Sequence, residues 1–310
     1  MAAAIRVYAP ATVANVAAGF DILGFAVHNP GDEVVARSSA SPGVRITAVS
    51  GGDGSIPLDP SRNTAGVSVQ CLFESTGYRG GIELELHKRM PSGSGLGSSA
   101  ASAVAAVVAA NELTGLNLER EDLLPFAMEA ERVACGAAHA DNAAPALLGG
   151  FVLIRSYDPL DIVRIPAPAE IFCAVVHPEI EIRTEDARRI LRSRITMRDA
   201  VVQWGNTAGL IAGLLKSDYA LIGRSLTDVI IEPARAILIP CFHQVKEAAL
   251  AAGALGCSIS GSGPSIFALT RGRQFAERAG GAMSAVYRSV GIDCETYISD
   301  VNSTGAVVLE

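Results

Sequence analysis

Alternating apolar and polar residues indicate that the first ninety residues are rich in strands. The alternation is clearest at Ile82, Leu84 and Leu86, which are separated by glutamates, as in a half-buried strand. Shorter apolar runs, each bounded by Gly, Pro, Asp or Ser, predict further strands at residues 5–8, 33–36 and 44–49.

Helical patterns follow. Residues 100–111 are almost all Ala and Val, with Ser98 or Ser99 placed to cap the helix. We expect helices at 63–75, 100–113 and 123–135, then, after a turn around Ala144-Pro145-Ala146, a strand at 151–154. The acidic run 119–122 places negative charge at the start of the third helix.

A proline-rich passage at 165–169 is the best domain boundary, giving domains at 1–165 and 166–310. Beyond it we expect strands at 171–176 and 266–269 and helices around 185–193, 200–215 and 241–252. The order is mixed α+β, without the regular alternation of a doubly wound parallel sheet.

Composition narrows the function. The 310 residues are 49% hydrophobic, enough for two domains, with a net charge of −7 and no block of like charge. Nucleic acid and anionic membranes are therefore poor partners, because both require a concentrated basic face. The N-terminus lacks a long apolar core and no twenty-residue apolar run follows, so we expect a cytoplasmic protein whose six scattered cysteines are reduced.

The segment Pro91–Ser102 (PSGSGLGSSAAS) lies between a predicted strand and a predicted helix. Its glycines can take positive φ, and the N–H groups that open a helix attract anions. No lysine precedes the serines, so this is not a Walker A loop, and the glycines lack dinucleotide-fold spacing. A tight turn would explain the glycines, but the serine pair adds donors for phosphate and an oxygen ligand for Mg²⁺.

A second cluster of polar residues lies close together in the sequence. His139, Asp141 and Asn142 fall within four positions bounded by apolar sequence, which favours a site, although a single histidine is more often structural. From spacing alone, Glu131 could be an exposed helix charge and Asp21 a solvated turn residue.

Residues 91–102 resemble the second signature of the galactokinase, homoserine kinase, mevalonate kinase and phosphomevalonate kinase (GHMP) superfamily. Residues 9–24 resemble the first signature of homoserine kinases, and residues 258–265 resemble the third superfamily signature. The resemblance spans 9–265. It implies a two-domain fold, with a ribosomal protein S5 domain 2-like N-terminal domain and a ferredoxin-like C-terminal domain, in which the last strand, within 296–309, returns to the first.

The resemblance further implies phosphorylation of L-homoserine by MgATP and, by default, a homodimer. Ser99 and Glu131 would hold Mg²⁺. The residues that would contact ATP are Asn63, Pro91, Ser92, Gly93, Ser94, Gly95, Leu96, Gly97, Ser98 and Ser99.

For the amino-acid substrate, the resemblance implies that Asn15 and Asp21 receive the ammonium and that Arg188 and Arg235 bind the carboxylate, as two separate clamps. The remaining substrate positions would be His139, Asp141, Asn142 and Gly261, and the catalytic set Ser99, Glu131, Asn142 and Thr184. Asn142 cannot act as a base, so Asp141, His139 or the phosphate itself would take the hydroxyl proton.

Two alternatives stay open. One is a GHMP kinase for a mevalonate-type acid, which the lack of lysine in residues 9–24 opposes. The other is a non-catalytic ligand sensor on the same fold, which the intact glycine loops, Ser99 and Glu131 oppose.

Overall fold

The computed structural model describes residues 4–52, 54–136 and 138–309. In this part of the chain the first sheet has seven strands, ordered β11-β1-β2-β4-β3, with β5 pairing β2 and β6. All its pairs are antiparallel except β3 with β4. Its strands are β1 (Ala4–Ala14), β2 (Leu23–Ser39), β3 (Gly43–Ser50), β4 (Gly81–His87), β5 (Phe151–Tyr157), β6 (Leu160–Ile165) and β11 (Val307–Leu309).

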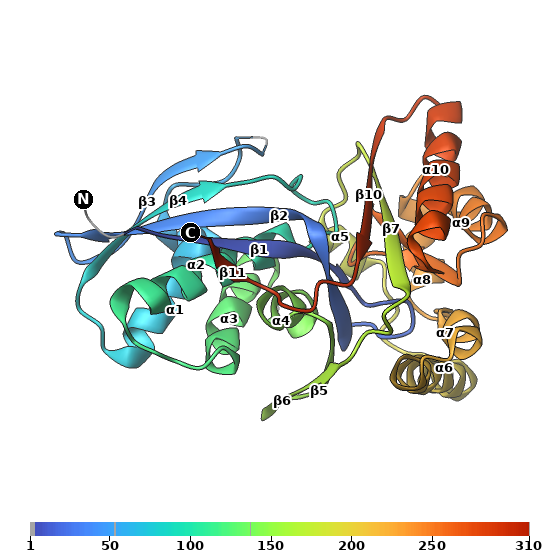
Figure 1. Cartoon of the computed structure of the whole chain (residues 1–310), viewed down its shortest axis with the longest axis horizontal. Helices are drawn as coiled ribbons and strands as arrows, with labels where there is room; N and C mark the ends of the chain where they lie inside the picture. The colour runs from blue at the N-terminus through green and yellow to red at the C-terminus, as the bar shows by residue number, and fades with distance from the viewer. Residues whose placement is uncertain (1–3, 53, 137, 310) are drawn as a thin grey trace.

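Helices cover one face of this sheet (Figure 1). They are α1 (Thr64–Thr76), α2 (Ser98–Thr114), α3 (Leu124–Cys135) and α4 (Ala140–Leu148), with 3-10 turns at Pro60–Arg62 and Glu121–Leu123. The predicted helices at 63–75, 100–113 and 123–135 are confirmed to within a few residues. The turn expected around Ala144-Pro145-Ala146 is wrong, because α4 runs through Pro145.

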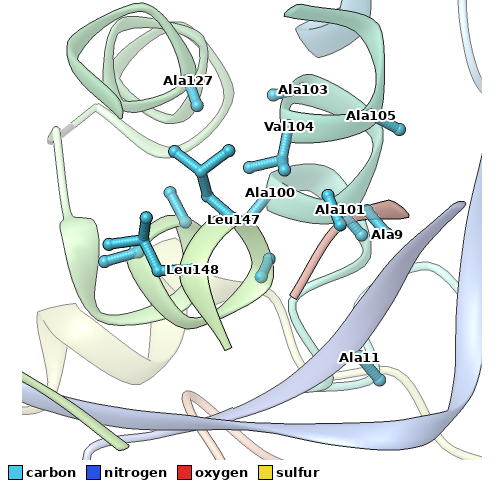
Figure 2. Close-up of a cluster of buried hydrophobic side chains, with 14 of the residues drawn as sticks. Ala9, Ala11, Ala100, Ala101, Ala103, Val104, Ala105, Ala127, Leu147 and Leu148 are labelled. Carbon is cyan, nitrogen blue, oxygen red and sulfur yellow. The ribbon is translucent and has the colours of Figure 1, made fainter. Parts of the chain in front are cut away.

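The core forms around α2, which is buried on all sides between residues 100 and 111. Its small side chains let the helix approach closely, so that Ala101 lies near Ala9 of β1 and Val104 near Leu147 of α4 (Figure 2). The small side chains thus bring the N-terminus of α2 close to β1.

The second sheet is antiparallel and ordered β10-β7-β9-β8. Its strands are β7 (Ile171–Pro178), β8 (Gly256–Ile259), β9 (Ile266–Arg271) and β10 (Cys294–Asp300), with α9 (Phe242–Ala251) and α10 (Arg273–Ser289) packed against it. The other elements are α5 (Thr184–Arg189), α6 (Met197–Lys216), α7 (Tyr219–Ser225), α8 (Glu232–Arg235) and a 3-10 turn at Ala236–Leu238.

The two sheets are packed together. β10 contacts β2, Val27 bridges Val301, and the rings of Phe25 and Phe267 lie 6.1 Å apart. Residues 294–300 pair with β7, and only β11 joins the first sheet, beside β1 (Figure 1). The expected α+β class is confirmed. Among the described residues, no helix is long and apolar enough to cross a membrane.

Candidate active site

A cavity of about 830 Å³ collects residues from both halves of the chain. Pro91 and Leu96 do not line it, and the side chain of Leu96 is fully buried in the core. The predicted site residues that do line it are Asn15, Asp21, Asn63, Ser92, Gly93, Ser94, Gly95, Gly97, Ser98, Ser99, Glu131, His139, Asp141, Asn142, Thr184, Arg188, Arg235 and Gly261.

The glycine loop reaches the start of α2 through three residues of positive φ, namely Gly93, Gly95 and Gly97. A Cβ on Gly97 would lie 2.2 Å from Oγ1 of Thr12 and 2.8 Å from Oδ1 of Asn142, so only glycine fits there. The Oγ atom of Ser94 is buried, and no residue of the described chain gives it a hydrogen-bond partner. The loop therefore presents a spare hydroxyl and helix N–H groups to an anion.

The expected serine cap of α2 is wrong. Gly97 occupies the N-cap position without a side-chain hydrogen bond, and Ser98 is already helical. The hydroxyl of Ser98 instead donates to Oδ2 of Asp32 at 3.1 Å. Asn63, predicted to contact ATP, caps α1 by accepting from the amide of Ala65.

The third signature, at 258–265, lies against the glycine loop. The Ser260 hydroxyl donates to the carbonyl of Gly95 at 2.7 Å, and the Ser265 amide donates to the carbonyl of Ser94 at 3.3 Å. Thr184 joins the same region, with 3.2 Å between its hydroxyl and that of Ser262. Two loops about 165 residues apart in sequence therefore form one end of the cavity.

Glu131 is only 7% exposed. Burial raises the pKa of its carboxyl, while a hydrogen bond from Ser99 and the charge of Lys88 lower that pKa. A carboxylate beside a hydroxyl, both facing the cavity, is a donor set that suits Mg²⁺, which takes few protein oxygens and fills the rest with phosphates and water.

His139, Asp141 and Asn142, at the start of α4, lie in different surroundings. Oδ1 of Asn142 accepts from the Thr12 hydroxyl at 2.7 Å, which holds the amide beside Gly97. Asp141 is buried, and this burial together with the charge of Asp21 raises the pKa of its carboxyl to about 7. Burial also lowers the pKa of His139, against the opposing effect of Asp21.

The charged groups expected as two separate clamps are joined. Arg188 donates two hydrogen bonds to Asp21, at 2.8 and 3.2 Å. Arg235 is buried and donates to the carbonyl of Gly261 at 2.9 Å, and burial and Arg188 lower its pKa to about 10. Both guanidinium groups lie over the ring of Phe20, at 5.6 and 5.1 Å from its centroid.

Asn15 lines the cavity, and its side chain bonds to backbone on both sides. Its amide accepts from the backbone N–H of Asp21 and donates to the carbonyl of Gly261. Asn15, Val16 and Ala17 all have positive φ, and three such non-glycine residues in a row form a strained turn. That turn places Asp21 in the cavity.

Known protein families match both halves of the chain. The family model for the GHMP kinases N terminal domain matches residues 63–150, and the GHMP kinases C terminal model matches 210–289. A homoserine kinase of Chlorobium phaeobacteroides is 53% identical over 98% of this chain and 99% of its own length. The chain belongs to the homoserine kinase family.

Two further relatives strengthen that assignment. A homoserine kinase of Chlorobaculum tepidum is 51% identical over 97% of each chain. The crystal structure of homoserine kinase from Cytophaga hutchinsonii is 57% identical, superposes with a TM-score of 0.96, and covers 99% of this chain and 97% of its own. The similarity therefore extends over both halves of the homoserine kinase fold.

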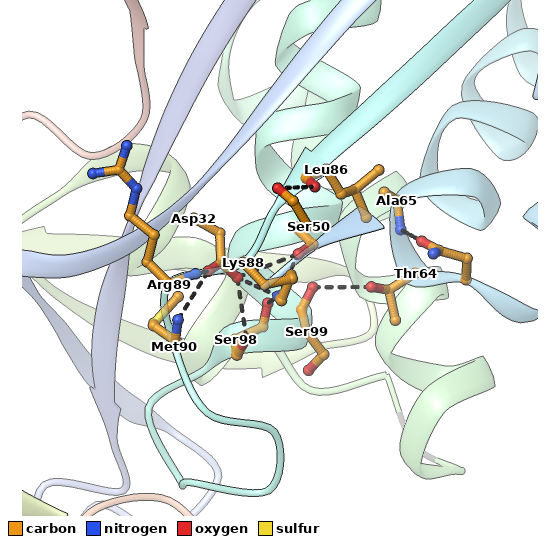
Figure 3. A network of polar contacts seen from close by, with 12 residues as sticks. Asp32, Ser50, Thr64, Ala65, Leu86, Lys88, Arg89, Met90, Ser98 and Ser99 are labelled. Atoms are coloured by element: carbon orange, nitrogen blue, oxygen red, sulfur yellow. Dashed lines mark hydrogen bonds and ion pairs between the residues drawn. The ribbon is translucent and has the colours of Figure 1, made fainter. Parts of the chain in front are cut away.

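The sequence analysis missed one buried ion pair of this homoserine kinase-family chain. Lys88 pairs with Asp32 and also donates to the carbonyl of Ser98 at 2.9 Å and to the hydroxyl of Ser102 at 2.6 Å (Figure 3). Asp32 accepts from the backbone of Arg89 at 2.8 Å. The pair ties β2 and β4 to the first turn of α2.

Burial lowers the pKa of Lys88, whereas Asp32 raises it. Lys88 lines the cavity and directly follows β4, which ends at His87. A lysine two positions after the alternating run 82–86 was the available signal. Its partner, 56 residues earlier, gave none.

Tyr157 was also missed. Its hydroxyl donates to the carbonyl of Asp21 at 2.6 Å and accepts from the amide of Ala140 at 3.2 Å. It thereby links the strained turn to α4. A tyrosine three residues after the strand predicted at 151–154 carries no signal of this kind in sequence.

Proposed function

We propose that this chain transfers the γ-phosphoryl group of ATP to the hydroxyl of L-homoserine, giving ADP and O-phospho-L-homoserine, a step of threonine biosynthesis. The observation that supports the proposal is the joint placement of an anion-binding loop and a set of buried and half-buried charges in one cavity. Asp21, Asp141, Arg188 and Arg235 carry the two signs that a zwitterion requires.

Substrate binding would exchange partners within that set. The ammonium would take the place of Arg188 at Asp21, and the freed Arg188 would join Arg235 at the carboxylate. An ammonium beside Asp141 would also stabilise its ionised form. A ligand with only one of these charges leaves a buried charge unpaired, which is costly, so the site favours an α-amino acid over a mevalonate-type acid.

On the phosphate side, the loop N–H groups and the Ser94 hydroxyl would orient the transferred group and stabilise its negative charge. Ser99 and Glu131 would hold Mg²⁺, which, when bound, supplies charge neutralisation for phosphate oxygens. Asn142, held by Thr12, would keep the acceptor hydroxyl in line. Positioning and charge neutralisation are what phosphoryl transfer chiefly needs, so a dedicated protein base is not required.

We further propose that the chain acts in the cytoplasm, with reduced thiols, and as a homodimer. The cysteines whose side chains the structure describes, at 71, 173, 241, 257 and 294, are free.

The deciding experiment measures ADP release from MgATP with L-homoserine, with R-mevalonate and with no acceptor, and identifies the product by mass spectrometry. We expect ADP and a phosphorylated product with L-homoserine only. Turnover with R-mevalonate instead would support the alternative that the chain is a GHMP kinase for a mevalonate-type acid. Binding of L-homoserine by calorimetry without any turnover would support the sensor.

A further inference from the structure

Tyr157 joins two walls of the proposed homoserine site from outside the cavity. It ends β5, in the β5–β6 hairpin at the lower edge of the molecule (Figure 1), and it does not line the cavity. Its hydroxyl donates to the carbonyl of Asp21 at 2.6 Å and accepts from the amide of Ala140 at 3.2 Å. The first wall is the turn that carries Asp21, and the second is the start of α4, which carries Asp141 and Asn142.

The first wall is a stretch of backbone that needs support. Asp21 has a φ of 60°, and residues 15–17 before it also have positive φ, which is costly for residues other than glycine. Strained backbone persists only where its surroundings hold it. Both backbone polar groups of Asp21 are held by side chains, because its N–H donates to Asn15 at 2.9 Å and its carbonyl accepts from Tyr157.

The second wall has no cap of its own. His139 occupies the N-cap position of α4 without a side-chain hydrogen bond, so the N–H groups that open the helix need another acceptor. The Tyr157 hydroxyl is the acceptor for Ala140, the first residue of that helix. Burial and the charge of Asp141 raise the pKa of Tyr157, so the hydroxyl stays protonated and can donate and accept at once.

The ring of Tyr157 also meets the ring of His139 edge-on, with 6.3 Å between the centroids and 84° between the planes. His139 lines the cavity, and both of its ring nitrogens are buried without a hydrogen bond from any described residue. Its Nδ1 atom lies 3.6 Å from Oδ1 of Asp21. Tyr157 therefore supports Asp21, the start of α4 and this imidazole, which are three parts of one ligand site.

We propose that Tyr157 is a positioning residue whose hydroxyl fixes the spacing between Asp21 and α4, and that this spacing sets the preference for a phosphoryl acceptor with an α-ammonium. The inference rests on the proposed function, in which Asp21 exchanges Arg188 for the ammonium. A carboxylate selects for that charge only if it stays in place when its partner leaves. Without the Tyr157 bond, Asp21 would move with Arg188, and a ligand lacking the ammonium would leave a smaller unpaired charge.

The test compares Tyr157→Phe with Tyr8→Phe in the full chain. The Tyr8 hydroxyl also donates to a backbone carbonyl, that of His28 at 2.5 Å, but neither of these residues lines the cavity or contacts its walls through that bond. Each change keeps the ring and removes one hydroxyl, and circular dichroism checks the fold. We expect Tyr157→Phe to raise KM for L-homoserine by about 3- to 10-fold, as loss of one hydrogen bond predicts, with KM for ATP unchanged. Tyr8→Phe should match the wild type in both.

Selectivity gives a second measurement. In competitive binding, the preference for L-homoserine over γ-hydroxybutyrate, which lacks the amino group, should narrow in Tyr157→Phe and stay unchanged in Tyr8→Phe. An equal loss of affinity for both ligands in Tyr157→Phe would overturn the link to the ammonium.

A double-mutant cycle separates positioning from a general loss of stability. If Tyr157 acts through Asp21, then Tyr157→Phe should change homoserine affinity little once Asp21→Asn is present, so the two effects should be strongly non-additive. Tyr8→Phe should show no such interaction with Asp21→Asn.

The inference and the proposed function fail differently. A wild type that does not turn over L-homoserine overturns both. Wild-type turnover with equal KM changes in Tyr157→Phe and Tyr8→Phe, or with additive effects of Tyr157→Phe and Asp21→Asn, overturns the role of Tyr157 and leaves the function standing.

Discussion

Glu129 and Glu131 lie two residues apart on α3 and have opposite surroundings. Glu129 pairs with Arg132 at the surface, whereas Glu131 is buried and faces the cavity beside Ser99. Both lie in the same short helical run, and the sequence does not show which of the two faces the glycine loop. Only the position of α3 relative to the glycine loop does so.

This contrast gives a matched experiment. Ser99→Ala and Glu131→Gln should each lower kcat by ~10²-fold or more at saturating Mg²⁺, because each removes an oxygen used mainly in the transition state. Glu129→Gln, on the same helix, should leave kcat unchanged. Equal turnover in all three variants would disprove the metal assignment.

Asp141 makes stability depend on pH. Burial and Asp21 raise its pKa to about 7, so the folded state binds a proton that the unfolded state has released near pH 4. The buried Asp141 carboxyl therefore destabilises the folded state only where it would be ionised. This cost is absent below pH 4, grows as pH rises, and is complete above pH 7. Asp141→Asn should therefore have a larger free energy of unfolding in urea than the wild type at pH 8. The difference should grow by up to ~1.4 kcal/mol per pH unit between pH 4 and pH 7. Asp122→Asn, at an exposed site, should show no such trend.

The role of Asp21 in substrate recognition can be tested by substitution. Asp21→Asn removes the charge that would bind the ammonium, so homoserine should bind ~1.5–3 kcal/mol more weakly. The preference over an analogue lacking the amino group should narrow, because the cost of the unpaired buried charge disappears. Competitive binding of the two ligands measures this preference, and an unchanged preference with weaker ATP binding would place Asp21 elsewhere in the mechanism.

The two ends of α2 show how one residue type can have different roles. Gly97 and Gly115 have nearly the same positive φ, 70° and 67°. A Cβ on Gly115 meets nothing within 4 Å, whereas one on Gly97 would overlap Thr12 and Asn142.

Gly115→Ala should therefore cost about 1 kcal/mol of stability, the backbone penalty alone, and leave kcat intact. Gly97→Ala should cost more and lower kcat, because the loop and Asn142 must move apart. Urea unfolding and steady-state kinetics on both variants decide the point. Equal losses in the two would mean that the contact at Gly97 carries no function.

The sequence predicted the elements better than their ends. Alternation located β4 and alanine content located α2, because both signals are local. The serine cap failed because the Ser98 hydroxyl bonds to Asp32, which is 66 residues away. Pro145 suggested a turn, yet it lies inside the nine-residue helix α4, which continues although a proline has no N–H to donate to the helix. Long-range partners such as Asp32 with Lys88 leave no trace in a single sequence.

At the scale of the whole molecule, the cavity exists because two sheets pack together and bring two glycine loops into contact. Motif order in the sequence placed most site residues in one cavity, but it could not show that Asp21 and Arg188 pair when no ligand is bound. That pairing depends on the angle between the two halves, which no local pattern encodes.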